Sequence, residues 1–352
     1  MPQDALRKIV SGQSLSREEA RQALTAIMDG LATPAQVGAL LVALRMKGET
    51  VEEVTGFVQA MRARVVAVRA HSAPLLDTCG TGGSAFRVFN VSTAAAFVAA
   101  AAGAVVAKHG NRAMSGVCGS ADVLEALGVR VSLTPEQCAE CIDAVGIGFL
   151  FAPHHHPAMK QVSGPRREIG VRSVFNLLGP LTNPAGATRQ VMGVYDGGLT
   201  SLAAGALREL GSERALVLHG EIGLDEISII GPTRVSELRD GIVTDYILAP
   251  RDFGMDCAEP DPADIAPASD PAENAEILRD VLSGVPGDGR ARARRDLVAV
   301  NAAASLRVCG LAEEWPEAVD LAKRILASGA AFEKVQNLAE LSRSQQSEFR
   351  SQ

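Results

Sequence analysis

From Pro74 onward, short apolar runs that end in glycine-rich turns alternate with alanine- and leucine-rich segments of helical period. The apolar runs are Leu75–Thr78, Ala104–Ala107, Gly148–Phe151, Val191–Tyr195 and Ala215–Leu218. Helical segments lie between or after these runs, at Thr93–Ala102, Ala121–Leu127, Pro135–Val145 and Thr200–Leu210. Strands that alternate with helices build layered domains in which the helices connect parallel strands. We therefore predict an α/β lobe with a mostly parallel central sheet.

The first seventy residues show a different pattern, with helical periods and no strand signal. Ser16, Thr33 and Thr50 each precede a helical apolar period, and Glu19 and Glu53 complete capping boxes in the first and third of these helices. At 352 residues the chain exceeds the usual size of a single hydrophobic core. The sequence thus predicts a small all-helical lobe packed on the larger α/β lobe.

The charge and apolar content of the chain argue against two classes of partner. The formal net charge is −7, whereas proteins that bind nucleic acid usually carry a basic surface. The longest apolar run, Val91–Ala107, is short for a membrane span, and the N-terminus lacks the layout of a signal peptide. The cysteines form no zinc-binding or disulfide pattern. We expect a cytoplasmic protein that binds neither nucleic acid nor a membrane.

A glycine-rich segment after the first predicted strand indicates phosphate binding. Gly80, Gly82 and Gly83 let successive backbone amides converge on an anion, because no Cβ atom obstructs them. The helix expected to begin near Ser92 or Thr93 adds its positively polarised N-terminus. A simple tight turn is the alternative. A dinucleotide-binding fingerprint is less favoured, since the helix begins too late and no ribose-binding acid follows about twenty residues on.

Two polar clusters at later strand ends extend the predicted site. The segment Lys108–Arg112 ends the second apolar run, and in open α/β sheets ligands gather outside the carboxyl ends of the strands. Asp225 and Glu226 lie in a glycine-bracketed loop after another run. Mg²⁺ prefers one or two carboxylates together with phosphate oxygens, so this pair suits the ion. Two solvated surface acids are the alternative.

The segment from residue 151 to residue 180 is less decisive. His154–His156 are three consecutive histidines, but adjacent side chains in one short turn seldom converge on a metal ion. Arg166 and Arg167, taken alone, are typical of a solvated charge pair. The residues by themselves therefore indicate no ligand here.

Five segments, in this order, resemble the anthranilate phosphoribosyltransferase family. They are Gly80–Thr93, Lys108–Arg112, Gly119–Gly128, Phe175–Ala185 and Gly223–Ser228. The resemblance implies transfer of the 5-phosphoribosyl group from phosphoribosyl pyrophosphate to anthranilate, giving N-(5-phosphoribosyl)anthranilate and pyrophosphate. This is the second step of tryptophan biosynthesis from chorismate. The resemblance also implies Mg²⁺, two ions per subunit, and a homodimer formed through the helical lobe.

By matched position, the resemblance implies a role for each residue of the site. The donor would be bound by Gly80, Gly82, Gly83, Ser84, Asn90, Val91, Ser92, Thr93, Lys108, His109, Gly110, Asn111, Ser115 and Ser120. Anthranilate would contact Gly80, His109, Asn111, His156 and Arg166. Ser92, Asp225 and Glu226 would ligate magnesium, and the catalytic residues would be Asp225, Glu226 and Lys108. Arg166 can meet the carboxylate of anthranilate with two parallel hydrogen bonds.

The family also implies a division of the chain into domains. The helical domain would comprise residues 1–70, joined by helices around residues 165–188. The donor-binding α/β domain would comprise residues 71–164 and 189–345, and residues 346–352 would form a frayed tail.

Four positions depart from the family pattern. Ser84 stands where the family usually has Asp, Ala85 where Gly is common, Val88 where a hydroxyl residue is usual, and Val117 where a basic residue is frequent. Two other functions remain open: a nucleic-acid-binding paralogue without enzymatic activity, and an enzyme similar to nucleoside phosphorylases. Lys108, Arg166 and the acid pair favour the transferase.

Overall fold

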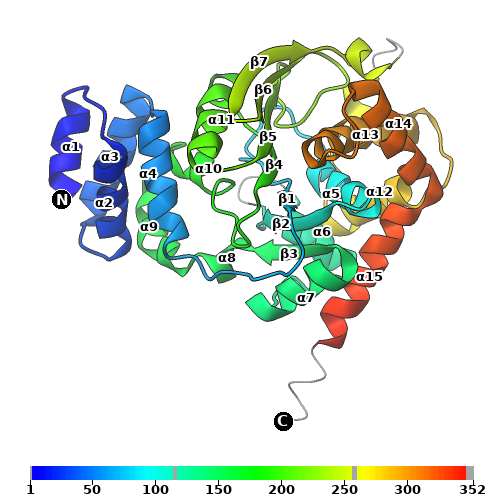
Figure 1. Ribbon diagram of the computed structural model, residues 1–352, viewed down its shortest axis with the longest axis horizontal. Coiled ribbons are helices and arrows are strands. Elements are labelled where there is room, and N and C mark those ends of the chain that lie inside the picture. The colour runs from blue at the N-terminus through cyan, green and yellow to red at the C-terminus, as the bar shows by residue number, and fades with distance from the viewer. Residues whose placement is uncertain (1, 114–116, 256–259, 346–352) are drawn as a thin grey trace.

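The computed structural model describes residues 2–113, 117–255 and 260–345, and Figure 1 shows a helical lobe beside a larger α/β lobe. The helical lobe contains α1 (Pro2–Val10), α2 (Arg17–Met28), α3 (Pro34–Lys47) and α4 (Val51–Arg62). The three helices predicted here are confirmed, with capping boxes formed at Ser16, Thr33 and Thr50. Helix α1 was not predicted, because its buried stripe of Pro2, Ala5 and Ile9 is too short to define a period.

Within the described residues, the α/β lobe contains a seven-stranded sheet of order β3-β2-β1-β4-β5-β6-β7. The strands are β1 (Leu75–Asp77), β2 (Val105–Gly110), β3 (Ile147–Phe151), β4 (Arg189–Gly193), β5 (Arg214–Gly220), β6 (Thr233–Arg239) and β7 (Ile242–Leu248). Strands β1 to β5 pair in parallel, which confirms the predicted mostly parallel sheet.

An antiparallel hairpin, β6–β7, extends one edge of the sheet and was not predicted. Its turn is Asp240-Gly241, and both residues have positive φ, 51° and 76°. These values are typical of the two-residue turns that fit the twist of a hairpin. The Asp-Gly pair was the available sequence signal for this turn.

Two hydrophobic cores lie on opposite faces of the sheet. In β5, Leu216 and Leu218 belong to the core that includes α5 (Val91–Ala101) and α13 (Gly289–Cys309). Ala215 and Val217 belong to the other core, with α11 (Thr200–Glu209) and the helical lobe. Successive strand residues point to opposite faces, so one strand serves both cores. The helical lobe is therefore continuous with one face of the sheet.

The remaining helices complete the two lobes. The α/β lobe also holds α6 (Ser120–Ala126), α7 (Pro135–Val145), α12 (Pro271–Leu282), α14 (Trp315–Ser328) and α15 (Ala330–Ser344), with short 3₁₀ turns η2 (Gly197–Leu199), η3 (Pro250–Phe253) and η4 (Pro262–Asp264). None of the described helices combines the length and apolarity that a membrane crossing requires. The predicted frayed tail, residues 346–352, lies outside the described residues.

Between β3 and β4 the chain leaves the sheet and packs on the helical lobe. This excursion contains α8 (Ala152–His155), η1 (Pro157–Met159), α9 (Lys160–Ile169) and α10 (Phe175–Leu178). Val162, Phe175 and Leu178 lie in the same core as the helices of the helical lobe, and α9 contacts α2 and α3. The expected excursion thus brings Arg166 between the lobes, although the predicted domain boundaries stay predictions.

Candidate active site

A cleft of about 520 Å³ opens where the loops after β1, β2 and β5 come together. Strand β1 lies between β2 and β4, so the direction of strand order reverses at this point and leaves a crevice at the carboxyl ends. The predicted residues that line the cleft are Gly80, Gly82, Gly83, Ser84, Asn90, Val91, Ser92, Thr93, Lys108, His109, Gly110, Asn111, Ser120, Arg166, Asp225 and Glu226. Ser115 lies outside the described residues, and His156 stands behind His109 rather than on the cleft wall.

The glycine loop, residues 80–84, crosses the end of β4 at close range. Gly82 and Gly83 have φ values of 62° and 79°, a left-handed conformation that other residues rarely adopt. The amide of Thr81 donates to the carbonyl oxygen of Gly193 at 2.8 Å. A Cβ atom on Gly193 would lie 1.6 Å from the carbonyl oxygen of Asp225, so this position requires glycine. The loops after β1 and β5 therefore meet at one point of β4.

The N-terminus of α5 faces this cleft without a side-chain cap. Asn90 occupies the N-cap position, but its side chain donates to the carbonyl of Cys118 at 3.1 Å instead of accepting from the helix. The amide of Ser92 donates to Oε1 of Glu226 at 3.2 Å. A helix N-terminus attracts anions, so α5 directs positive potential into the cleft.

Lys108 lies directly beneath the glycine loop and the start of α5. Its buried ammonium group donates to the carbonyl and hydroxyl oxygens of Thr78, at 3.2 and 3.0 Å. The Thr78 hydroxyl in turn donates to the carbonyl of Ser92 at 3.2 Å. Burial lowers the pKa of Lys108, while Asp77 and Glu226 oppose this effect. The arrangement holds a cation where the two predicted phosphate-binding elements converge.

The acid pair, Asp225 and Glu226, lies against the glycine loop and the start of α5. The hydroxyl of Ser84 donates to Oδ1 of Asp225 at 2.5 Å, which ties the glycine loop to the pair. Burial raises the pKa of Glu226 to about 8, and the charge of Asp225 adds to this rise. Lys108 and the hydrogen bonds from Ser92 act in the opposite direction. An acid pair that is short of positive charge, beside hydroxyl and amide groups, fits a divalent cation.

The lining of the cleft also contains an unpaired guanidinium. Arg166, at the end of α9, is half-buried and lies 5.3 Å from the ring centroid of Phe175. Burial lowers the pKa of Arg166. Among the residues that the structure describes, this side chain has no hydrogen-bond or ion-pair partner. A half-buried cation without a partner favours an anionic ligand.

His109, on the cleft wall, contacts His156 behind it. Their Nε2 atoms lie 3.2 Å apart, and their ring centroids lie 5.1 Å apart. Burial lowers the pKa of His156 to about 4 and the pKa of His109 well below its ordinary value. Both rings are therefore neutral near pH 7 and can share one proton between their facing nitrogens.

The three consecutive histidines have three different surroundings. His154 lies against the ring of Phe151, His155 contacts the carbonyl of Val66 at 2.9 Å, and His156 contacts His109. Their side chains do not converge on one point in the described structure.

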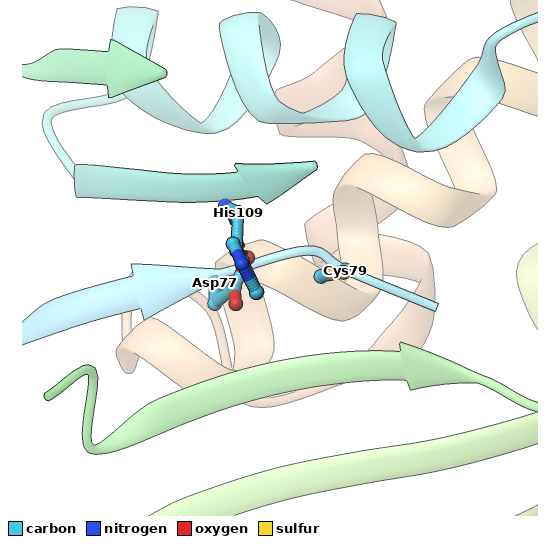
Figure 2. A group of neighbouring side chains, drawn as sticks. All are labelled: Asp77, Cys79 and His109. Carbon is cyan, nitrogen blue, oxygen red and sulfur yellow. Dashed lines mark hydrogen bonds between the residues drawn. The ribbon is translucent and has the colours of Figure 1, made fainter. Parts of the chain in front are cut away.

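Asp77, Cys79 and His109 form a second cluster with metal-ligand side chains, shown in Figure 2. Asp77 and His109 lie side by side at the ends of β1 and β2, and Cys79 follows in the loop after β1. The two carboxylate oxygens of Asp77 already accept hydrogen bonds from the His109 amide and from Asn183, at 3.1 and 2.7 Å. Burial raises the pKa of the Cys79 thiol. This cluster therefore braces the strand ends and is less suited to a cation than Asp225 and Glu226.

Two buried amides that support the site were missed in the sequence. Asn301, in α13, accepts from the amide of Ile227 at 2.8 Å and donates to its carbonyl at 3.1 Å. It thus fixes the chain directly after Glu226. Asn183 donates to Asp77 and to the carbonyl of Ala107, at 2.7 and 2.8 Å. The available signal for Asn301 was a single amide inside the apolar run of residues 297–304.

Comparisons with known proteins agree with this architecture. Residues 72–332 match the family model described as the glycosyl transferase family, a/b domain. Residues 3–65 match the glycosyl transferase family, helical bundle domain. The chain is 51% identical over 331 residues to the anthranilate phosphoribosyltransferase of Moorella thermoacetica, which covers 94% of this chain and 95% of that protein. It is 52% identical over 336 residues to the anthranilate phosphoribosyltransferase of Symbiobacterium thermophilum, and the match covers 95% of this chain and 96% of that protein.

Solved structures of the same kind are also similar. The anthranilate phosphoribosyltransferase of Thermus thermophilus superposes with a TM-score of 0.89 at 43% identity, over 97% of this chain and 99% of that one. The anthranilate phosphoribosyltransferase of Saccharomyces cerevisiae, in complex with PRPP and Mg, superposes with a TM-score of 0.86 at 28% identity. The match covers 97% of this chain and 98% of that one.

Proposed function

The chain belongs to the anthranilate phosphoribosyltransferases of the glycosyl transferase family, and from this premise we propose how its own residues perform the transfer. The enzyme moves the 5-phosphoribosyl group of phosphoribosyl pyrophosphate to anthranilate. The amine nitrogen forms a bond to C1 of the ribose, and pyrophosphate departs with the electron pair of the broken C1–O bond. The amine then loses a proton. Catalysis depends mainly on neutralising the leaving pyrophosphate and on holding the two reactants in line.

The donor occupies the end of the cleft formed by the glycine loop and α5. Gly80, Gly82 and Gly83 present backbone amides, and Ser84, Gly110, Asn111 and Ser120 line the adjoining wall. Ser115 belongs to the same proposal from the resemblance alone. The N-terminus of α5 at Asn90–Thr93, which the Asn90 side chain does not cap, and the buried ammonium of Lys108 supply positive potential beneath the phosphates. These groups stabilise negative charge as the leaving group departs.

Magnesium is held by Ser92, Asp225 and Glu226, with two ions per subunit. The donor set of carboxylate and hydroxyl oxygens suits this ion, and the raised pKa of Glu226 supports an acid pair that requires a neighbouring cation. The yeast relative was solved in complex with PRPP and Mg, which supports magnesium as the ion. When bound, Mg²⁺ neutralises charge on the pyrophosphate oxygens.

The acceptor's carboxylate pairs with Arg166, and the unpaired, half-buried guanidinium is the single observation that carries this assignment. Gly80 and Asn111 border the aromatic ring, with His109 and His156 beside them. The amine of anthranilate is neutral near pH 7, so the site positions it rather than deprotonating it beforehand.

The assembly is a homodimer formed through the helical lobe. Val10, Leu31 and Met46 of this lobe are exposed apolar side chains, which supports a contact there. We place the enzyme in the cytoplasm, since the cysteines recorded in the described residues are free. Light scattering at micromolar protein concentration measures the oligomeric state.

The direct test is the loss of anthranilate fluorescence when the protein is mixed with phosphoribosyl pyrophosphate and Mg²⁺. Consumption that requires both additions is the expected result. No consumption, together with a gel shift of single-stranded nucleic acid at moderate salt, would support the nucleic-acid-binding alternative instead. The nucleoside phosphorylase alternative lacks a use for Arg166, because a nucleobase offers no carboxylate.

A further inference from the structure

Arg172 connects the segment that carries Arg166 to the glycine loop. Its Nη2 donates a hydrogen bond to the carbonyl oxygen of Gly83. Its guanidinium carbon lies 4.4 Å from the centroid of the Tyr195 ring, within the range of a cation–π contact. Arg172 comes from the excursion between β3 and β4, whereas Gly83 and Tyr195 follow β1 and β4. One side chain therefore joins the excursion to the glycine loop and to the residues that follow β4.

Tyr195 also holds the glycine loop through its backbone. Its amide donates to the hydroxyl oxygen of Thr81 at 3.0 Å, and the Thr81 amide donates to Gly193 at 2.8 Å. The loop is thus anchored at residue 81 by the end of β4. It is anchored at residue 83 by Arg172, which itself rests on Tyr195. If Arg172 moves, the second anchor is lost while the first remains.

A short chain segment connects Arg166 to Arg172. Helix α9 ends after Ile169, and Gly170 has a φ of 63°, so the chain turns sharply before Arg172. The next turn is fixed by the amide of Ser173, which donates to the side chain of Asn176 at 3.1 Å. Arg166 packs over Phe175 in that same turn. A short, hydrogen-bonded segment therefore connects Arg172 to the turn on which Arg166 packs.

Arg172 is not among the side chains that line the cleft. Its guanidinium contacts the carbonyl oxygen of Gly83 and the ring of Tyr195. It therefore acts on the donor through the glycine loop.

We propose that Arg172 is a positioning residue that couples occupancy of the acceptor end of the cleft to the conformation of the donor-binding loop. The proposal rests on the proposed function, in which Arg166 binds the acceptor's carboxylate and the glycine loop binds the donor. A carboxylate on Arg166 restrains the segment from Arg166 to Phe175, and Arg172 then holds Gly83 in the donor-binding conformation. Because coupling between two sites is reciprocal, donor binding strengthens acceptor binding by the same factor.

The experiment measures the donor's dissociation constant by calorimetry, with Mg²⁺ present, in the absence and presence of saturating benzoate. Benzoate carries the carboxylate but lacks the amine, so no transfer occurs. In the wild-type enzyme we expect benzoate to tighten donor binding by about fivefold or more. In Arg172→Met, which keeps an apolar stem and removes the guanidinium, the ratio of the two dissociation constants should fall to about one.

Three further variants separate coupling from folding and from charge. Arg167→Met removes a neighbouring exposed cation from α9 and should keep the wild-type ratio. Tyr195→Leu removes the ring beneath Arg172 but keeps the backbone bond to Thr81. Its ratio of donor dissociation constants should fall to about one, as in Arg172→Met. The double variant Arg172→Met/Tyr195→Leu should show the same ratio as each single variant, because both substitutions remove the same linkage. The melting temperature of each variant shows that it is folded.

The outcomes distinguish this inference from the proposed function. If Arg172→Met weakens donor binding equally with and without benzoate, Arg172 acts on the donor directly and the coupling role is wrong. If the wild-type enzyme binds both ligands but benzoate leaves the donor's dissociation constant unchanged, the coupling inference is wrong and the proposed function stands. If it binds neither, the proposed function fails first.

Discussion

The hydroxyl group of Ser84 donates a 2.5 Å hydrogen bond to Oδ1 of Asp225, joining two loops that are 141 residues apart in the chain. Ser84 thereby meets the acid pair with a neutral donor at a position where the family usually carries a carboxylate. The glycine loop consequently rests against Asp225 without charge repulsion. This contact defines how the donor loop and the predicted metal ligands depend on each other.

Replacing Ser84 by Asp should make the protein more dependent on magnesium. Two carboxylates at this distance repel unless a cation lies between them, so Ser84→Asp should lower the melting temperature without Mg²⁺. With saturating Mg²⁺ it should tighten donor binding severalfold. Ser84→Ala is the control, since it adds no charge and loses only a hydrogen bond to a carboxylate, worth about 1.5–3 kcal/mol. A donor KM above the wild-type value at every Mg²⁺ concentration would refute the prediction.

Removing the charge of the acid pair should abolish most turnover. Asp225→Asn combined with Glu226→Gln keeps the side-chain shapes but removes the ligands for the cation, and kcat should fall on the order of 100-fold or more. EDTA should have the same effect on the wild-type enzyme. Circular dichroism should show that the double variant is folded. Full activity of the double variant would exclude the metal assignment.

Truncating Arg166 should affect the acceptor more than the donor. Arg166→Ala removes a hydrogen-bonded charge pair worth about 1.5–3 kcal/mol, so KM for anthranilate should rise roughly 10- to 100-fold. KM for phosphoribosyl pyrophosphate should change less. Arg166→Lys should recover part of the loss, because it restores the charge without the two parallel hydrogen bonds. An equal or larger effect on the donor would mean that Arg166 is assigned to the wrong ligand.

Asp77 should make the folded protein relatively less stable as the pH rises from 4 to 6. Burial raises the pKa of this carboxyl to about 6, above the value of about 3.9 in an unfolded chain. In this interval the folded state binds more protons than the unfolded state, so deprotonation on raising the pH favours unfolding. The full effect above pH 6 is at most about 3 kcal/mol.

The measurement is the unfolding free energy of wild type minus that of Asp77→Asn, determined in urea from pH 4 to pH 7.5. The difference should decrease with pH up to about 6 and then remain constant. The substitution also disturbs the hydrogen bond with Asn183, but that cost is independent of pH and only shifts the curve. A difference that increases with pH would show that the pKa of Asp77 is lowered in the folded protein.

Local features of the fold were predictable because they depend on residues three or four apart. The helix starts at Ser16, Thr33 and Thr50 follow from a side chain and a backbone amide of the same turn. The loop at Gly82 and Gly83 follows from a conformation that glycine adopts without strain. The parallel sheet follows from the alternation of strands and helices, which limits the topology to a few solutions.

The contacts that make the cleft specific join residues far apart in the chain, and only the tertiary structure decided them. Ser84 donates a hydrogen bond to Asp225, and Arg172 donates one to Gly83. Asn301 accepts one from the amide of Ile227. These segments come together because two cores pack on opposite faces of the sheet. No period or spacing in the sequence specifies which of many polar side chains will meet. The sequence alone determined the types of element and the chemistry available at the strand ends, since both depend on local conformation. Packing of the helices on the sheet determined which of those groups face one another, because each contact depends on the position of the whole element.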